Sequence, residues 1–231
     1  AAHAASRALA DEPATIDEPG GDETPAVDRP AAVDDAKAEP DDTRRAWQRG
    51  RAGTAIGRAV HAVLQSVDLA DPDGLAAIAH AQSLAEGIPG REREIERLAR
   101  SALGAPIVAE ARASGRFWRE VPVATPIGDV IVEGFVDLLI ETPAGLVVVD
   151  WKTDSVPDES AMDAAVERYT LQGAAYALVL EQVLDRPVAR CVFVFTRSPK
   201  ALEREVADLP AAVAAVRANL RHLQSPAAVT G

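Results

Sequence analysis

Two apolar runs joined by a tight turn constrain this chain more than any other stretch. The runs cover about residues 129–141 and 146–152, and the residues between them, Thr-Pro-Ala-Gly, have turn chemistry. The segment is therefore predicted to form a β-hairpin. Three consecutive valines, Val147 to Val149, indicate that its second strand is buried, where an unpaired carboxylate would be costly.

The register of this hairpin brings charged residues together. A symmetric hairpin that pairs Thr142 with Gly145 also places Asp137 directly opposite Asp150 on the same face. Two facing carboxylates repel each other unless a positive charge lies nearby, and strand alternation puts Lys152 on the face of Asp150. Two acids and one amine then converge on one spot, which suits a divalent cation and a reacting anion. The alternative is that Lys152 merely neutralises Asp150, but that alternative leaves Asp137 unexplained.

The remaining periodicity predicts helices and strands in a mixed order. Before the hairpin, we expect a helix from Asp42 or Thr43 to about residue 69, two or three short helices between 71 and 113, and a strand over 116–125. After the hairpin, we expect a helix over 162–184, strands over 188–196 and 201–207, and a closing helix over 209–223. The fold class is therefore α/β: a mixed sheet of four to five strands flanked by helices, with a helical N-terminal part.

Two further polar residues could join the hairpin site. His61 lies four residues after Gly57, on the same face of the first predicted helix. Glycine costs a helix about 1 kcal/mol relative to alanine, so Gly57 suggests the close approach of another backbone. On the strand before the hairpin, Glu120 could orient a metal-bound water, or it could simply pair with Arg119.

One helix carries polar and aromatic side chains at helical spacing. Tyr169, Gln172 and Tyr176 are three and four residues apart and share one face. On a helix that packs on a sheet, such side chains form either the edge of the core or contacts to a substrate.

Charge and composition divide the chain. The formal net charge is −12, but residues 1–43 hold twelve acids and three bases, which leaves about −3 for the rest. Residues 1–43 are predicted to be a disordered acidic linker, although a tail that mimics nucleic acid or docks a partner would have a similar composition. The folded domain is expected to cover 44–225, followed by a tail at 226–231.

Composition also indicates the kind of polypeptide and the cellular compartment to which this chain belongs. The sequence begins with Ala, and its one methionine is Met162, so it looks like a piece of a longer polypeptide. The single cysteine, Cys191, lies in an apolar run and is expected to be a buried thiol in a reducing compartment. One cysteine cannot supply a cysteine-ligated iron–sulfur cluster or zinc site. No stretch approaches the length of a membrane span, so no membrane association is expected.

Five short segments occur in a characteristic order. They are G-R-A-V-H at 57–61, R-E-V-P-V at 119–123, G-F-V-D at 134–137, D-W-K-T at 150–153 and Y-T-L-Q-G-A-A-Y at 169–176. Each motif alone is weak, but the ordered set resembles the RecB-type nuclease module of the PD-(D/E)xK superfamily. It is similar in particular to the C-terminal nuclease domain of RecB/AddA helicase–nucleases, over roughly residues 45–223.

The resemblance implies a role for each candidate residue. His61, Asp137 and Asp150 would be side-chain metal ligands, joined by the backbone carbonyl of Trp151, and Lys152 would be the catalytic lysine. Glu120 would be an auxiliary catalytic acid. Gln172 and Tyr176, with Tyr169 on the same helix face, would lie near the DNA backbone.

The same resemblance implies the cofactor, partners and setting. Mg²⁺ would be the ion, since two carboxylates suit it, and the imidazole also suits Mn²⁺. Because His61 must be neutral to bind a cation, binding is expected to weaken below about pH 6.5. The chain would be an exonuclease that acts on DNA ends in double-strand-break repair and recombination. Its partners would be a helicase motor on the same polypeptide and a second helicase–nuclease subunit, in the bacterial cytoplasm at the nucleoid. The alternatives are a non-catalytic DNA-binding module of this fold and a hydrolase of small phosphates.

Overall fold

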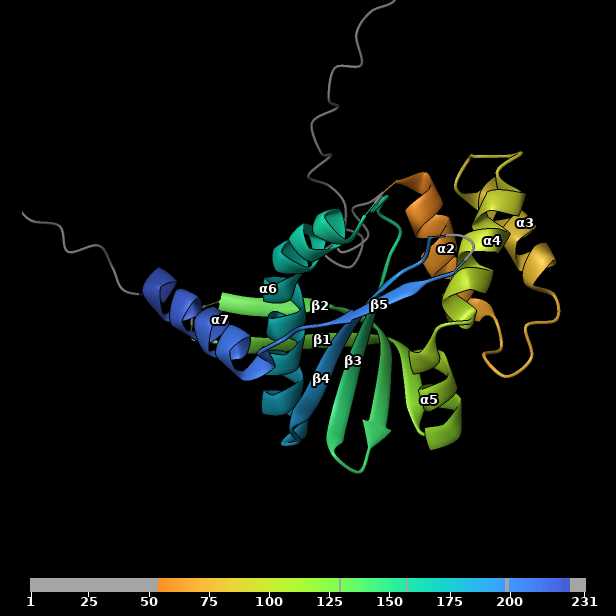
Figure 1. Cartoon of the computed structure of the whole chain (residues 1–231). Helices are drawn as coiled ribbons and strands as arrows, with labels where there is room; N and C mark the ends of the chain where they lie inside the picture. Colours follow the sequence, from red (N-terminus) through yellow and green to blue (C-terminus); the bar gives the residue numbers. More distant parts are fainter. Residues whose placement is uncertain (1–53, 129, 157, 198–199, 225–231) are drawn as a thin grey trace, which may run out of the picture. The chain divides into compact units, whose positions relative to one another are not determined.

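The computed structural model describes residues 54–128, 130–156, 158–197 and 200–224. The predicted linker, the predicted helix cap at Asp42 or Thr43 and the predicted C-terminal tail lie outside these residues. Within them, a five-stranded mixed sheet carries helices on both faces, with four helices before the first strand (Figure 1). The predicted fold class is confirmed.

Each predicted element is present, with shifted ends. The helices before the sheet are α2 (Ala55–Ser66), α3 (Leu75–Ala85), α4 (Glu92–Leu103) and α5 (Pro106–Ser114). The strands are β1 (Phe117–Ile127), β2 (Val130–Thr142), β3 (Gly145–Lys152), β4 (Val188–Phe195) and β5 (Leu202–Glu205). The long helix α6 (Glu159–Leu184) connects β3 to β4, and α7 (Leu209–Gln224) follows β5. No helix among the described residues is long and apolar enough to cross a membrane.

The predicted hairpin forms in the predicted register. β2 and β3 pair antiparallel from Thr142 opposite Gly145 to Leu138 opposite Val149. The strands lie in the sheet in chain order, and β3 with β4 is the one parallel pair among the described strands. Every residue of β3 is buried, which fits its central position and its run of valines.

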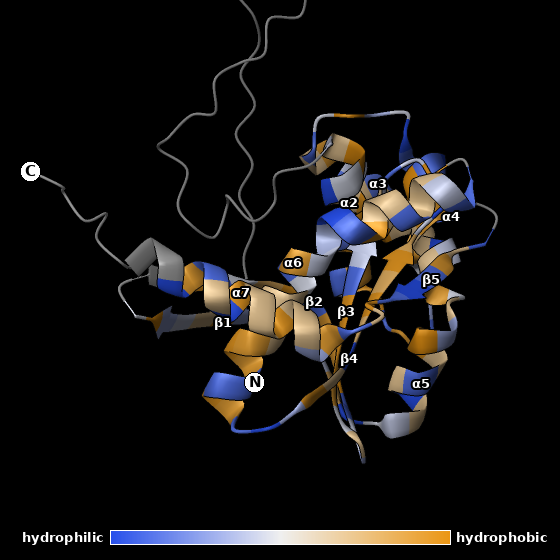
Figure 2. Ribbon diagram, turned by 60° about the vertical axis from the view of Figure 1, so that its left-hand side comes forward, coloured by the Kyte–Doolittle hydropathy of each residue, from blue (hydrophilic) through white to orange (hydrophobic). Residues whose placement is uncertain are grey.

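The sheet separates two hydrophobic cores. On one face, α2, α3, α4 and α5 pack with residues that include Leu138, Ile140 and Trp151. On the other face, α6 and α7 pack with residues that include Val148 and Phe193. The apolar strand β4 runs between these two layers (Figure 2).

The β1–β2 pair changes faces at one position. Val136 packs with the α6–α7 core, whereas Leu138 packs with the α2–α5 core, although strict alternation would put both on one side. The change falls at Asp137 and at Glu120 opposite it, where the β1–β2 ladder skips one residue on each strand. Glu120 has a φ of 50°, a left-handed conformation that is unfavourable for a residue with a Cβ. Backbone strain of this kind gathers at functional sites.

The contact between α6 and β4 is close enough to exclude a methyl group. A Cβ placed on Gly173 would lie 2.5 Å from Sγ of Cys191 and 3.1 Å from Cζ of Phe193. Glycine therefore lets α6 approach the sheet, and this approach sets the depth of the side chains that α6 presents to the sheet.

We expect Gly173→Ala to lower the free energy of unfolding by about 1–3 kcal/mol, the usual cost of overpacking, despite the better helix propensity of alanine. Adding Cys191→Ala should recover part of this loss, because the smaller side chain leaves room for the methyl group. Urea unfolding of the two single variants and the double variant would measure both effects. A Gly173→Ala protein as stable as the parent would contradict the close contact.

Candidate active site

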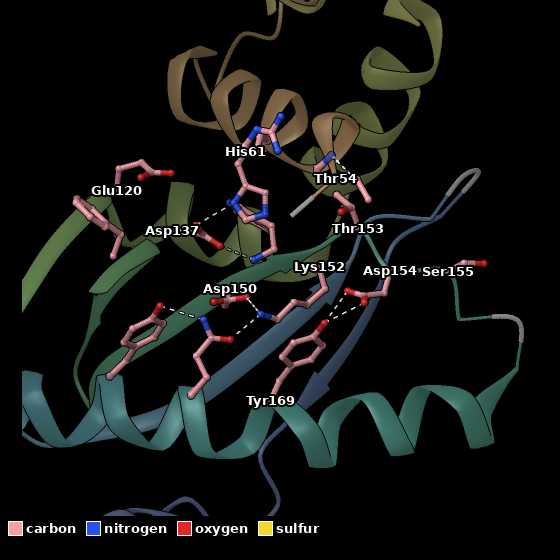
Figure 3. A pocket seen from close by; sticks show the side chains of 16 residues that line it. Thr54, His61, Glu120, Asp137, Asp150, Lys152, Thr153, Asp154, Ser155 and Tyr169 are labelled. Carbon is pink, nitrogen blue, oxygen red and sulfur yellow. Dashed lines mark hydrogen bonds and ion pairs between the residues drawn. The ribbon is translucent and has the colours of Figure 1, made fainter. Parts of the chain in front are cut away.

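The nine residues that the sequence predicts for the site line one pocket. It has a volume of about 570 Å³ and lies where β3 ends, between α2 and α6 (Figure 3). The nine predicted residues that line it are His61, Glu120, Asp137, Asp150, Trp151, Lys152, Tyr169, Gln172 and Tyr176. His61 comes from α2 on one face of the sheet, and the last three come from α6 on the other face.

The first turn of α2 is held against the end of β3. The hydroxyl of Thr54 caps the helix by accepting a hydrogen bond from the backbone N–H of Gly57 at 3.1 Å. A Cβ on Gly57 would lie 2.9 Å from Oγ1 of Thr153. The predicted close approach of another backbone to Gly57 is wrong, because the neighbours within 4 Å are the side chains of Thr153 and Thr54.

The last turn of α2 is tied to β1. The guanidinium of Arg119 donates hydrogen bonds to the carbonyl oxygens of Leu64 and Val67. Arg119 therefore anchors the helix that carries His61, a role that the sequence did not indicate. With both ends fixed, α2 holds the imidazole over the sheet.

Three carboxylates lie in a row across three neighbouring strands. Glu120 of β1 and Asp137 of β2 are the two residues skipped between the ladder pairs Arg119–Leu138 and Val121–Val136. Asp137 and Asp150 of β3 stand directly beyond Leu138–Val149, the last pair of the β2–β3 ladder. Asp137 itself makes no regular ladder pair with either neighbouring strand. Instead its Oδ2 accepts a hydrogen bond from the backbone N–H of Trp151 at 2.7 Å, and its Oδ1 lies 3.1 Å from Nδ1 of His61. The side chain of Asp137 thus replaces a backbone acceptor where the hairpin ladder ends.

Among the described residues, one group of metal-ligating side chains contains Glu120. One atom each of His61, Glu120 and Asp137 lies within 4.8 Å of the others. The sequence prediction gave Asp150 the place of third side-chain ligand and Glu120 an auxiliary one. Asp150 lies next in the row, but it is engaged by Lys152.

Lys152 pairs with Asp150 as alternation predicted. Its Nζ lies 2.7 Å from Oδ2 of Asp150, and both residues are buried, with 9% and 4% of their surface exposed. This contact is an ion pair whose geometry does not make a hydrogen bond. The same ammonium donates a hydrogen bond to Oε1 of Gln172 at 2.8 Å and lies 3.7 Å from the centre of the Tyr169 ring.

The α6 residues contact Lys152 and each other. Nε2 of Gln172 donates to the hydroxyl of Tyr176 at 3.0 Å, and the hydroxyl of Tyr169 donates to Oδ1 and Oδ2 of Asp154 at 2.9 and 3.0 Å. The sequence prediction placed this helix face near the DNA backbone, which stays a prediction. Sequence reasoning missed Asp154, although it stands two residues after Lys152, and a half-buried tyrosine hydroxyl needs an acceptor.

Burial and neighbouring charges shift the pKa values of His61 and Asp150 in this pocket. Burial lowers the pKa of His61, but the charge and hydrogen bond of Asp137, with the charges of Asp150 and Glu120, outweigh it and raise the pKa to about 9. Burial and the charge of Asp137 raise the pKa of Asp150 to about 6, against the lowering effect of Lys152. At neutral pH, His61 is therefore protonated, and its positive charge lies beside Asp137.

The donor set fits a divalent cation. Carboxylate oxygens and one imidazole nitrogen are ligands for Mg²⁺ and Mn²⁺. The protonated imidazole occupies the place of a cation among the carboxylates, and loss of its proton turns Nδ1 into a ligand atom. The described residues thus contain a possible metal site of His61, Glu120 and Asp137.

Comparison with known proteins gives the family. Residues 36–229 match the profile of the PD-(D/E)XK nuclease superfamily, and the chain belongs to that superfamily. It is 35% identical over 163 residues to an ATP-dependent helicase/nuclease subunit of Desulforudis audaxviator, a match that covers 61% of this chain and 13% of that protein. It is 28% identical over 181 residues to a protein of the same name from Bacillus cereus strain AH820, which covers 64% of this chain and 14% of that protein.

The chain thus matches only a small part of these long relatives, 13% of one and 14% of the other. Among solved structures, a Eubacterium rectale protein described as a candidate exonuclease matches with a TM-score of 0.37 and 17% identity, over 64% of this chain and 66% of that one. A likeness at that TM-score supports no inference about this chain.

The raised pKa of His61 can be measured without any metal. In EDTA, we expect the His61 imidazole to titrate near pH 9 in an NMR titration, because Asp137 and its neighbours favour the protonated ring. Asp137→Asn should lower this midpoint, because it removes the carboxylate that stabilises the protonated ring, whereas burial still favours the neutral ring. An unchanged His61 midpoint in Asp137→Asn would contradict the assigned contact.

Proposed function

We propose that this domain is a divalent-metal-dependent deoxyribonuclease that hydrolyses phosphodiester bonds, acting as an exonuclease on DNA ends. One observation carries the proposal: three carboxylates on adjacent strands, an imidazole and a buried lysine meet in a single pocket of a chain from a nuclease superfamily. This combination supplies ligands for a cation and a fixed positive charge for a phosphate.

The proposed metal ligands are His61, Asp137 and Asp150, with the Trp151 carbonyl and with Glu120 beside them. A bound Mg²⁺, or Mn²⁺ in its place, would acidify a water molecule and neutralise charge on the phosphate oxygens. Asp137 is oriented for this role by the Trp151 N–H, which leaves its other oxygen on the side of His61.

Lys152 is proposed to stabilise the charge that builds on the scissile phosphate. Its ammonium is buried, so its interaction with an anion is screened less than it would be in water. Gln172 and Tyr176 are proposed to lie beside the DNA backbone, and Gln172 also holds the ammonium in place. Glu120 is the auxiliary acid at the other end of the row.

The wider setting is also part of the proposal. The relatives are helicase/nuclease subunits of which this chain matches a small part, so we infer that it is the nuclease module of such a protein. Its partners would be DNA, a helicase motor on the same polypeptide and a second subunit, in the cytoplasm at the nucleoid, in double-strand-break repair and recombination. Outside residues 1–43 the chain carries a charge of about −3, so the motor is proposed to deliver the DNA strand.

A non-catalytic DNA-binding module of the same fold is the second candidate. A binding module has no need for a buried lysine between an aspartate and a glutamine, and here Lys152 is held in that way. The paired acids and amine therefore favour the enzyme.

Cleavage of linear single- and double-stranded DNA by this chain should require Mg²⁺ or Mn²⁺ and stop in EDTA. We expect Lys152→Gln and Asp150→Asn to lower the cleavage rate by about 10²–10³-fold, the usual cost of removing electrostatic help to a transition state. These variants keep side-chain volume, so circular dichroism should show an intact fold. Lys200→Gln is the matched control, because Lys200 is exposed and does not line the pocket.

Two results would contradict the nuclease proposal. One is parental cleavage by a pure Asp150→Asn preparation. The other is DNA binding by the parent chain with no divalent-dependent cleavage of either substrate, which would favour the binding module.

Metal binding should depend on pH through His61. Because its pKa is about 9, an ion must displace a proton at neutral pH, and affinity should fall about tenfold per pH unit below 9. From the sequence alone, metal binding was expected to weaken below about pH 6.5. The raised pKa of His61 moves that expected weakening to the range below about pH 9. Calorimetry of Mn²⁺ binding in buffers of different ionisation enthalpy should show about one proton released per ion near pH 7.5. His61→Gln should abolish that release, and an equal release in this variant would refute the assignment.

A further inference from the structure

The Lys152 ammonium has more partners than a simple ion pair requires. The ammonium makes an ion pair with Oδ2 of Asp150, donates a hydrogen bond to Oε1 of Gln172 and lies over the face of the Tyr169 ring. The first two are short polar contacts, and the third is a cation–π contact of 3.7 Å to the ring centre. The Tyr169 ring is thus the nearer of two aromatic rings beside the ammonium, since the centre of the Phe193 ring is 5.6 Å away.

The Tyr169 ring is itself fixed by an acid on the segment that follows β3. Its hydroxyl donates to both carboxylate oxygens of Asp154, which follows Lys152 by two residues. A tyrosine that donates to a carboxylate carries more electron density in its ring, because hydrogen-bonded groups polarise one another, and this strengthens its attraction for a cation. Asp154 therefore acts on Lys152 through the ring.

We propose that Tyr169 and Asp154 are positioning residues that hold the Lys152 ammonium in place for catalysis, an inference that rests on the proposed nuclease function. If a cation bound Asp150, the ion pair to Lys152 would weaken, and the Tyr169 ring and Gln172 would still hold the ammonium. This assignment differs from a DNA contact for Tyr169, because it predicts an effect on the turnover rate and not on DNA affinity.

The kinetic test uses variants that separate the ring from its hydroxyl. We expect Tyr169→Phe and Asp154→Ala each to lower kcat about fivefold, and the double variant to lose no more than either single change, because both remove the same hydrogen bond. Tyr169→Leu removes the ring as well and should lower kcat about thirtyfold. KM for DNA should stay unchanged in all of them, and Asp154→Asn should recover part of the rate. Asp163→Ala, an exposed acid on the same helix, is the control.

A second readout does not depend on nuclease activity. The chain has only three lysines, Lys37, Lys152 and Lys200, so lysine-labelled protein gives few side-chain signals in an NMR spectrum. The ring current of Tyr169 should shift the ε-methylene signal of Lys152 upfield from the other two in metal-free protein. Tyr169→Leu should remove this shift, and Asp154→Ala should reduce it.

These measurements distinguish the two proposals. If the parent chain does not cleave DNA but the Lys152 signal shifts as expected, the nuclease function fails while the positioning contact stands. If the parent cleaves and Tyr169→Phe or Asp154→Ala raises KM at constant kcat, the residues contact DNA and the positioning role is overturned. Additive losses in the double variant, or a Lys152 signal that Tyr169→Leu leaves unmoved, would also overturn it.

Discussion

Repulsion among three carboxylates is the constraint on which the rest of this structure depends. Glu120, Asp137 and Asp150 lie in one row across β1, β2 and β3, where like charges destabilise a sheet. His61 from one face and Lys152 from β3 supply positive charge within hydrogen-bond distance of two of these acids. Such a sheet is stable only while the negative charges of the acids are balanced by a protonated imidazole, by the lysine ammonium or by a metal ion. The carboxylates whose repulsion would destabilise the sheet are therefore the same groups that could bind a metal ion.

The change of faces at Glu120 and Asp137 explains how side chains from both layers reach one pocket. In a regular sheet, α2 and α6 would be separated by the strands, and His61 could not share a cavity with Gln172. Here β1 and β2 shift from one core to the other at the row of acids, so Asp137 lies where the two faces meet. The left-handed backbone at Glu120 is the local cost of this arrangement.

Much of this arrangement follows from the sequence by simple rules. The turn at 142–145 sets the register that brings Asp137 toward Asp150, and alternation places Lys152 beside Asp150. Strand alternation did not predict that β2 turns its side chains to the other face of the sheet at Asp137. Val136 and Leu138 are two residues apart, so alternation puts them on one face, but they pack in different cores. The anchoring of α2 by Arg119 was also out of reach, since an arginine that donates to helix carbonyls leaves no periodic signal. Asp154 was missed because its partner comes from a separate helix.

Helix α6 couples the positions of the three side chains that it presents to the pocket. It has 26 residues, so it is about 39 Å long, and its tight contact with β4 at Gly173 lies in the same turn as Gln172. Tyr169, Gln172 and Tyr176 occupy two successive turns of this one rigid rod. Because one helix carries all three residues, a displacement of α6 would move the Tyr169 ring and the Gln172 amide away from the Lys152 ammonium together. The position of the Lys152 ammonium is therefore coupled to the position of the whole helix, through the Tyr169 ring and the Gln172 amide.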